Sequence, residues 1–158
     1  MRFQDQAVRM TQRALDDICR AARAVPEDKR EWVPMGAARS VLDQMQEIAA
    51  AAPWFLPILR ERKMPVFDAH AKREAVRLRQ THATVEDCIL AAQSHTALLC
   101  GVIESMEDEH LEEEIELPFG GGMKLSLADV CMLHHNNMQY HLGQINQIQL
   151  MLGDREMH

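Results

Sequence analysis

Four long stretches of this chain repeat an apolar residue every three or four positions, and this periodicity constrains the fold more than any other feature. Residues at that spacing share one face of an α-helix, so each stretch predicts an amphipathic helix with one buried side. Aromatic residues make up only 4% of the chain, whereas Ala, Leu, Met, Gln, Glu and Arg, all good helix formers, are common. The sequence therefore predicts an all-α protein.

A segment rich in helix breakers separates the first two predicted helices. The first helix covers residues 3–24, and "PEDKREWVPMG" (26–36), with two prolines and a glycine, ends it. The second helix begins near Ala37. Its apolar stripe consists of Val41, Met45, Ile48, Ala52, Phe55 and Leu59. Pro53 and Pro57 are expected to kink or interrupt this helix, because each proline removes a backbone hydrogen-bond donor.

The third long helix is predicted to follow a short extra helix. The connector 64–83 is expected to hold the short helix, and Thr84 with Asp87 is a capping signal for the long one. The acidic run 107–116 ends the third helix, and the glycine-rich segment 117–126 comes next. That segment lacks the pattern of a phosphate-binding loop, so it is interpreted as a flexible turn or small hairpin.

The fourth long helix is predicted over residues 127–152. Ser126 and Asp129 form its capping signal, and Gly153 closes it. Four long amphipathic helices with one short extra helix are typical of a four-helix bundle. A chain of 158 residues can bury one core and is too short for two ordinary domains, so residues 1–158 are expected to form a single domain.

Charge and composition limit the expected partners. The formal net charge is −7, and basic residues cluster only mildly in 59–63 and 71–79, which argues against a nucleic-acid partner. The N-terminal residues lack the apolar core of a signal peptide, and no run of 18 apolar residues exists, so we expect a cytoplasmic protein without a membrane partner. Four scattered cysteines are expected to be buried and reduced: Cys19, Cys88, Cys100 and Cys131.

The segment "HHNNMQYH" (134–141) places unusual polar residues on the fourth helix. His134, Asn137 and His141 are three and four residues apart, so they form one stripe beside the apolar face. His135 falls nearer the apolar line. Neutral imidazoles are good zinc, nickel and iron ligands, whereas an asparagine oxygen is a weak one. From the residues alone, hydrogen-bonded and half-buried polar side chains are the simpler interpretation.

The stretch "NNMQYHLGQINQIQLMLG" (136–153) resembles the C-terminal helix signature of the DinB/YfiT-like superfamily of bacterial four-helix-bundle proteins. That signature runs approximately Asn-His-x-x-x-His-Arg-Gly-Gln. Four residues match it: Asn136, His141, Gly143 and Gln144. Asn137 stands where the family has a histidine, and Leu142 where it has an arginine. Residues 31–55 and 116–130 are similar in kind to the family's second helix and to the approach to its fourth helix.

The resemblance implies a metal site between the second and fourth helices. The family's triad takes one histidine from the second helix and two from the fourth, around zinc or nickel with open water positions. In this chain the corresponding residues are Glu47, Asn137 and His141, a harder and weaker ligand set than three imidazoles. Two outcomes remain open. Either a divalent metal binds, with His134 or His135 as a substitute ligand, or the metal is lost and a hydrogen-bonded Glu–Asn–His cluster remains.

The function implied by the resemblance is that of a metal-dependent hydrolase or thiol transferase acting on an unidentified small molecule. His134 and His135 are then the candidate catalytic residues, as proton shuttles. His95 faces the same interior and is interpreted first as a core histidine bonded to a neighbour. The alternative is a non-catalytic binding or interaction protein that has lost the metal. A homodimer is expected in both cases.

Overall fold

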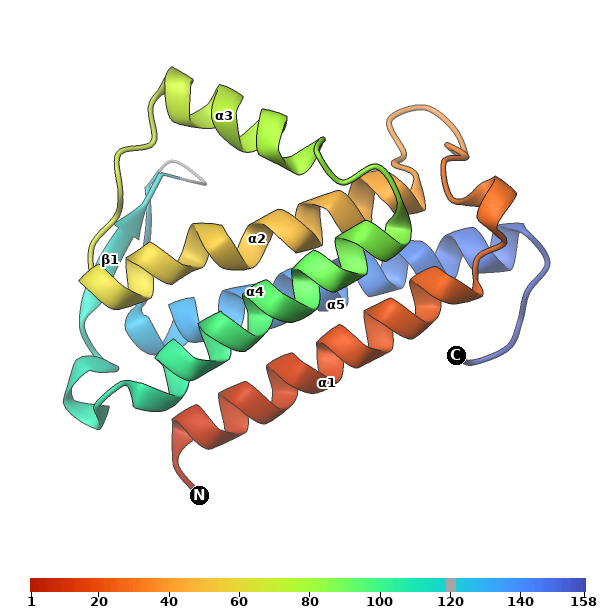
Figure 1. Cartoon of the computed structure of the whole chain (residues 1–158). Helices are drawn as coiled ribbons and strands as arrows, with labels where there is room; N and C mark the ends of the chain where they lie inside the picture. Colours follow the sequence, from red (N-terminus) through yellow and green to blue (C-terminus); the bar gives the residue numbers. More distant parts are fainter. Residues whose placement is uncertain (119–121) are drawn as a thin grey trace.

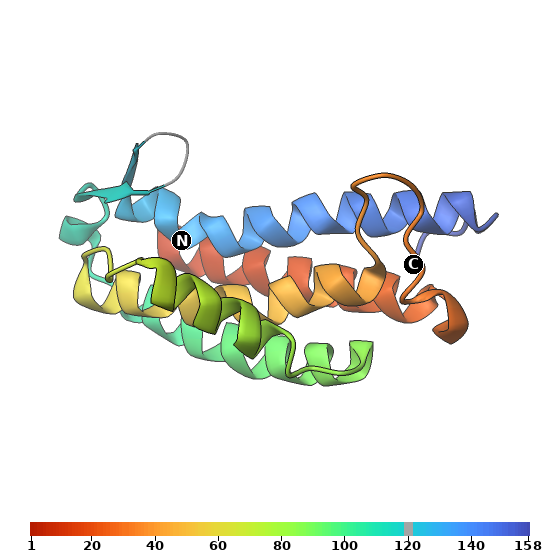
Figure 2. The ribbon, with the colours of Figure 1, turned by 90° about the horizontal axis from the view of Figure 1, so that it is seen from above.

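The four predicted long helices form a four-helix bundle (Figure 1). The structure is a computed structural model that describes residues 1–118 and 122–158. The bundle consists of α1 (Phe3–Ala24), α2 (Val41–Glu61), α4 (Val85–Ser105) and α5 (Leu127–Met151). The short helix α3 (Ala69–Arg79) follows α2 and lies along its outer side, apart from the other three (Figures 1 and 2). The expected all-α architecture with a short extra helix is confirmed.

The helix starts follow side-chain caps. Thr84 accepts a hydrogen bond from the backbone N–H of Asp87 at 3.1 Å, and Ser126 does the same for Asp129 at 3.1 Å, which confirms both predicted capping signals. The second helix begins at Val41 and not near Ala37, because Ser40 is its N-cap. Such caps satisfy backbone donors that have no partner in the first helical turn.

The prolines of α2 do not interrupt it, so of the two expected effects, a kink or an interruption, the interruption is wrong. The helix runs unbroken through Pro53 and Pro57. Pro53 has no N–H to donate to the carbonyl of Ala49, four residues earlier. The Nδ1 of His95 donates to that carbonyl from α4, with 2.9 Å between nitrogen and oxygen. His95 is therefore a half-buried structural residue that supplies the hydrogen bond the proline cannot make.

The core extends along the length of the bundle. Its fully buried side chains include large aliphatic residues from all four long helices, such as Ile18, Met45, Ile89 and Ile145. The four cysteines are buried and unpaired, as expected. Burial raises the pKa of the Cys88 thiol to about 12, so this thiol is protonated at neutral pH and unreactive.

A small antiparallel hairpin precedes α5. It consists of β1 (Glu114–Leu117) and β2 (Met123–Ser126), with Ile115 opposite Leu125. The possibility of a hairpin in the glycine-rich segment is thus confirmed, although residues 119–121 lie outside the described part of the chain. The hairpin covers one end of the bundle beside the start of α5 (Figure 1).

Helix α4 is the most apolar of the described helices. By length and composition alone it is apolar enough to cross a membrane, with a mean hydropathy of 1.2 over its best window. Within the bundle its buried side includes Val85, Ile89, Leu99 and Ile103. The apolar residues that make α4 resemble a membrane span therefore form part of the core of the bundle.

Candidate functional site

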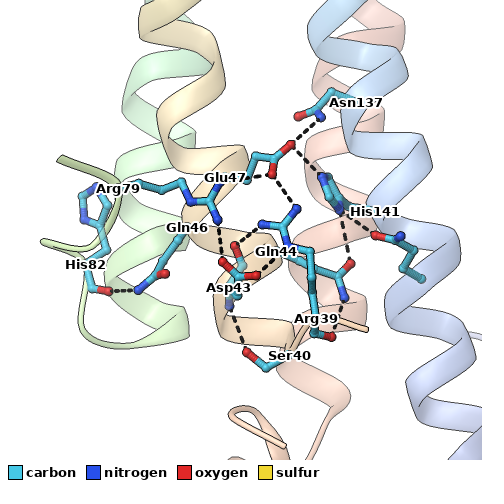
Figure 3. Close-up of polar contacts among 11 residues, drawn as sticks. Arg39, Ser40, Asp43, Gln44, Gln46, Glu47, Arg79, His82, Asn137 and His141 are labelled. Atoms are coloured by element: carbon cyan, nitrogen blue, oxygen red, sulfur yellow. Dashed lines mark hydrogen bonds and ion pairs between the residues drawn. The ribbon is translucent and has the colours of Figure 1, made fainter. Parts of the chain in front are cut away.

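The side chains of Glu47, Asn137 and His141 meet between α2 and α5 (Figure 3). One carboxylate oxygen of Glu47, Oε1, accepts hydrogen bonds from His141 Nε2 at 3.1 Å and from Asn137 Nδ2 at 3.3 Å. These are the three residues that the sequence places at the expected site. The helical spacing of Asn137 and His141 puts them one turn apart on the face of α5 that looks toward α2.

The His141 ring is held on both of its nitrogens. The side chain is only 1% exposed, and its Nδ1 lies 2.9 Å from Gln144 Oε1 and 3.3 Å from Gln44 Oε1. Gln44 donates its amide nitrogen to the carbonyl of Arg39 at 3.2 Å, which leaves its oxygen directed at the imidazole. Because a carboxylate only accepts, the Nε2 nitrogen carries the proton shared with Glu47.

Two arginines complete the network from the opposite side of Glu47 (Figure 3). The other carboxylate oxygen, Oε2, lies 2.5 Å from Arg39 Nη1 and 3.3 Å from Arg79 Nη1. Asp43, one turn before Glu47 on α2, also binds both guanidiniums, with 2.5 Å to Arg39 Nε and 2.5 Å to Arg79 Nη2. Two carboxylates and two guanidiniums thus balance in charge.

The sequence pattern does not point to these two arginines. Arg39 lies in the connection before α2, and Arg79 is the last residue of α3, so no helical spacing relates either of them to α5. The available signal was the Asp43–Glu47 pair at i and i+4, which places two carboxylates on one face of α2 and calls for cations nearby. That signal does not say which of the 17 basic residues provide the charge.

The network keeps its carboxylates ionised. The hydrogen bond from His141, followed by the bond and charge of Arg39, holds the pKa of Glu47 well below its usual range against the opposing effect of burial. The pKa of Asp43 is lowered by its hydrogen bond with Arg39 and by Arg79. Glu47 is therefore an anion at any physiological pH.

An apolar cavity of about 450 Å³ opens beside the network, between α2, α3 and α5. Its walls are formed by Ala50, Ala51, Trp54, Phe55, Phe67, Ala75 and Val76. Its polar residues are Glu47, Arg79 and Asn137, all members of the network. The volume is in the range of small-molecule sites, which are mostly apolar with a few polar groups that fix orientation.

The structure does not bring the two candidate proton shuttles to this network. His134 is fully buried, and its Nε2 lies 2.9 Å from the hydroxyl of Thr96 on α4. Its Nδ1 has no hydrogen-bond partner within the described residues. The half-buried His135 lies 3.0 Å from the side chain of its neighbour Asn136. No contact of either ring supports a role in proton transfer at Glu47 or His141.

The donor set does not fit a resident zinc or nickel ion. Among residues 1–118 and 122–158, no three His, Cys, Asp or Glu side chains form a group that could hold a metal. Asn137 Oδ1 is buried and has no hydrogen-bond partner among the described residues. A single neutral oxygen is nevertheless a weak ligand for zinc or nickel. His141 directs an N–H, and not a lone pair, toward Glu47 and therefore does not offer this nitrogen to a metal. Arg39 and Arg79 also place positive charge beside Glu47.

No family model matches the sequence, and no curated protein is similar to it at a significant level. Solved structures do match over nearly the whole chain. YfiT of Bacillus subtilis, described as a probable metal-dependent hydrolase with an unusual four-helix bundle topology, has a TM-score of 0.75 at 12% identity and covers 96% of this chain and 88% of its own. A DinB-like protein of the same species, YjoA, has a TM-score of 0.69 at 16% identity and covers 97% and 96%.

A mycothiol-dependent maleylpyruvate isomerase also shares the fold. Its TM-score is 0.72 at 9% identity, and the match covers 92% of this chain but only 63% of the isomerase. The superposed region is therefore one part of a longer enzyme. This fold thus occurs in a probable metal-dependent hydrolase and in a mycothiol-dependent isomerase.

The expected exclusion of nucleic acid as a partner is overturned. ClbS, a colibactin self-resistance protein with a TM-score of 0.69 and 11% identity over 93% of this chain and 95% of its own, was solved in complex with double-stranded DNA. Net negative charge excludes a broad electrostatic footprint, but it does not prevent local contacts with phosphates or bases. A net charge of −7 was therefore not sufficient ground for that prediction.

Sequence identities of 9% to 16% limit what these likenesses show. They carry the arrangement of the helices and leave activity, substrate and metal to be argued from the residues themselves. The four-helix bundle and its match to these structures agree with the fold that the resemblance of the last helix implied. The chain has the four-helix-bundle fold that the DinB-like protein YjoA and YfiT share.

Proposed function

We propose that this chain is a cytoplasmic hydrolase or thiol transferase that acts on a small molecule bound in the cavity between α2, α3 and α5. The observation that carries the proposal is that Glu47 and Asn137 belong both to the buried His141 network and to the wall of that cavity. Polar groups fixed by buried partners, at the end of an apolar cavity, are the usual form of a small-molecule site.

The apolar and polar residues of the cavity would have different roles in binding. The aromatic side chains Trp54, Phe55 and Phe67 would bind an apolar body, and Trp54 already packs edge-on against Phe67 with 5.7 Å between ring centroids. Glu47 and Asn137 would orient the reacting group of the substrate. Because Glu47 is held as an anion, its role is to position the substrate and to keep the His141 proton on Nε2, and not to act as a general acid.

The guanidinium of Arg79 adds a positive charge at the same end of the cavity. A fixed cation beside a reacting group stabilises an oxyanion or a thiolate, and both hydrolysis and thiol transfer develop such a charge. The chain's own residues can therefore provide electrostatic stabilisation without a step that passes through a metal ion.

A turnover screen tests this proposal. Purified untagged protein is assayed against chromogenic esters, amides and thiol conjugates, with and without EDTA. We expect one class to be turned over, with activity that survives EDTA and falls by about 100-fold or more in Glu47→Gln, since loss of one oriented electrostatic group costs roughly that much. The matched control is Glu112→Gln, which changes an exposed carboxylate outside the cavity.

Two results would count against it. Activity of Glu47→Gln equal to that of Glu112→Gln would remove Glu47 from the reaction. Ligand binding in the cavity without turnover of any class would leave a binding protein and not an enzyme. The expected homodimer stays a prediction, and the mass of the untagged protein in solution measures it.

A further inference from the structure

Positive charge already lies beside Glu47, one of the three residues around which the resemblance puts a metal ion. Arg39 reaches Glu47 from the connection before α2, and Arg79 reaches it from the end of α3, so the two guanidiniums flank the carboxylates of Asp43 and Glu47 (Figure 3). Each guanidinium also binds Asp43 at 2.5 Å, so neither is free to swing away without breaking a second ion pair. Both side chains are less than one-third exposed.

A divalent ion at this point would compete with these contacts. It would need lone pairs on Glu47, but the carboxylate accepts four hydrogen bonds, from His141, Asn137, Arg39 and Arg79. A carboxylate has about four lone-pair positions, so no accepting position remains. The ion would also lie close to two fixed positive charges, and repulsion between like charges is strong in a partly buried site.

We infer that the Arg39–Arg79 pair takes the place of a metal ion in this chain. The pair supplies the positive charge that holds Glu47 in position against His141, and it leaves the site unable to bind a divalent cation. Arg39 and Arg79 are thus positioning residues for the Glu47–His141 pair. The inference concerns charge and metal binding in the resting protein, so it does not depend on any turnover.

The test removes the two charges and asks whether a metal site appears. The protein is the full chain without a histidine tag, and the probe is zinc chloride alone, measured by isothermal titration and by the metal retained after dialysis. The test variant is Arg39→Met with Arg79→Met, which keeps much of the apolar stem and removes both guanidiniums. The matched control is Arg73→Met with Arg77→Met, two exposed arginines of α3 that make no contact with Glu47.

The expected results differ sharply between the proteins. Wild type and the control retain less than about a tenth of an equivalent of zinc. The Arg39→Met/Arg79→Met variant binds about one equivalent, roughly 10- to 100-fold more tightly than wild type, since unmasked ligands change affinity on that scale. Adding His141→Ala to this variant abolishes the gain. Wild type that binds a full equivalent of zinc, or a folded double variant that gains none, overturns the inference.

A second variant keeps the inference falsifiable if the double variant does not fold. Asn137→His adds an imidazole beside His141 and leaves both arginines in place. We expect it to bind zinc no better than wild type, because the positive charges remain. Zinc binding by Asn137→His at one equivalent would show that the ligand set, and not the arginines, is what excludes the ion. Loss of turnover in any of these proteins would bear only on the proposed function.

Discussion

His134 is a neutral imidazole buried in the bundle and is therefore a pH-sensitive structural residue. Burial, followed by the nearby charge of His135, lowers its pKa from 6.5 to about 4. Its hydrogen bond with the hydroxyl of Thr96 ties α5 to α4. Protonation of this ring would place a charge in an apolar environment, so the folded state resists it.

The first prediction concerns the loss of stability in acid. The unfolded chain protonates His134 near pH 6.5, whereas the folded chain does so only near pH 4. Stability from this residue is therefore full above pH 6.5 and falls between pH 6.5 and 4, by about 3 kcal/mol at most. In His134→Gln this part of the pH dependence should disappear. Urea unfolding of wild type, His134→Gln and the control His135→Gln at pH 7.5 and 4.5 measures it, and parallel losses in all three proteins would contradict it.

At the same scale, the sequence and the resemblance predict three residues of the site but not its two arginines. Asn137 and His141 could be placed on one face because helical spacing is a local property, and the resemblance added Glu47. The positions of Arg39 and Arg79 relative to Glu47 could not be predicted. Each residue lies next to a connecting segment, and the path of that segment decides where the side chain points. Their contacts with Glu47 come from packing of α3 and of the connection 26–40 against α2, which no local pattern encodes.

At the scale of the helix, a side chain of α4 compensates for the hydrogen bond that one of the two prolines of α2 cannot make. His95 on α4 donates to the Ala49 carbonyl that Pro53 leaves without a partner. The sequence of α2 alone favoured a kink or an interruption at the prolines, because it does not contain the residue that compensates for them. This hydrogen bond joins two residues that are 46 positions apart in the chain.

The second prediction tests this compensation with a double-mutant cycle. In the wild-type background, His95→Ala leaves the buried Ala49 carbonyl unpaired and should lower the free energy of unfolding by about 1–3 kcal/mol. In the Pro53→Ala background the new backbone N–H bonds the same carbonyl, so the same substitution should cost about 1 kcal/mol less. Urea unfolding of the four proteins gives the coupling energy. Equal costs in the two backgrounds would mean that the His95 contact does not compensate for the proline.

Helix α3 depends on its ends for its position. None of its residues is buried, and it is connected to α2 by the ion pairs of Arg79 at its last residue and by the contact of Trp54 with Phe67 before its first. The backbone carbonyl of His82, just after α3, also accepts a hydrogen bond from Gln46 at 2.8 Å. The helix thus forms one wall of the cavity and makes few buried contacts with the bundle.

The third prediction is that Arg79 limits the opening of α3. Arg79→Met removes the ion pairs to Asp43 and Glu47, so amides of residues 69–79 should exchange with deuterium roughly tenfold faster, while those of α2 change little. Arg77→Met is the control, because Arg77 pairs with Glu74 on the exposed face of α3 itself. Equal exchange in the two variants would show that packing around Phe67, and not the ion pairs, holds the helix.

At the scale of the whole molecule, the periodic pattern was sufficient for the architecture. Apart from the later start of α2, the helix ranges agree with sequence expectations, and so do the caps at Thr84 and Ser126 and the hairpin before α5. Each of these rests on local hydrogen bonding or on an apolar face. The comparison with solved structures then confirmed the fold. The cavity and the charge balance around Glu47 could not be predicted, since they arise where three helices and a connection meet.

The central claim is that Glu47 and His141 form one coupled pair inside the bundle, held by charges that the chain itself supplies. A double-mutant cycle with Glu47→Gln and His141→Gln, followed by urea unfolding at pH 7.5 without added metal, measures that coupling. A charge-assisted hydrogen bond between a buried imidazole and a partly buried carboxylate predicts a coupling energy of about 1–3 kcal/mol. Costs that add to within about 0.5 kcal/mol would contradict the claim.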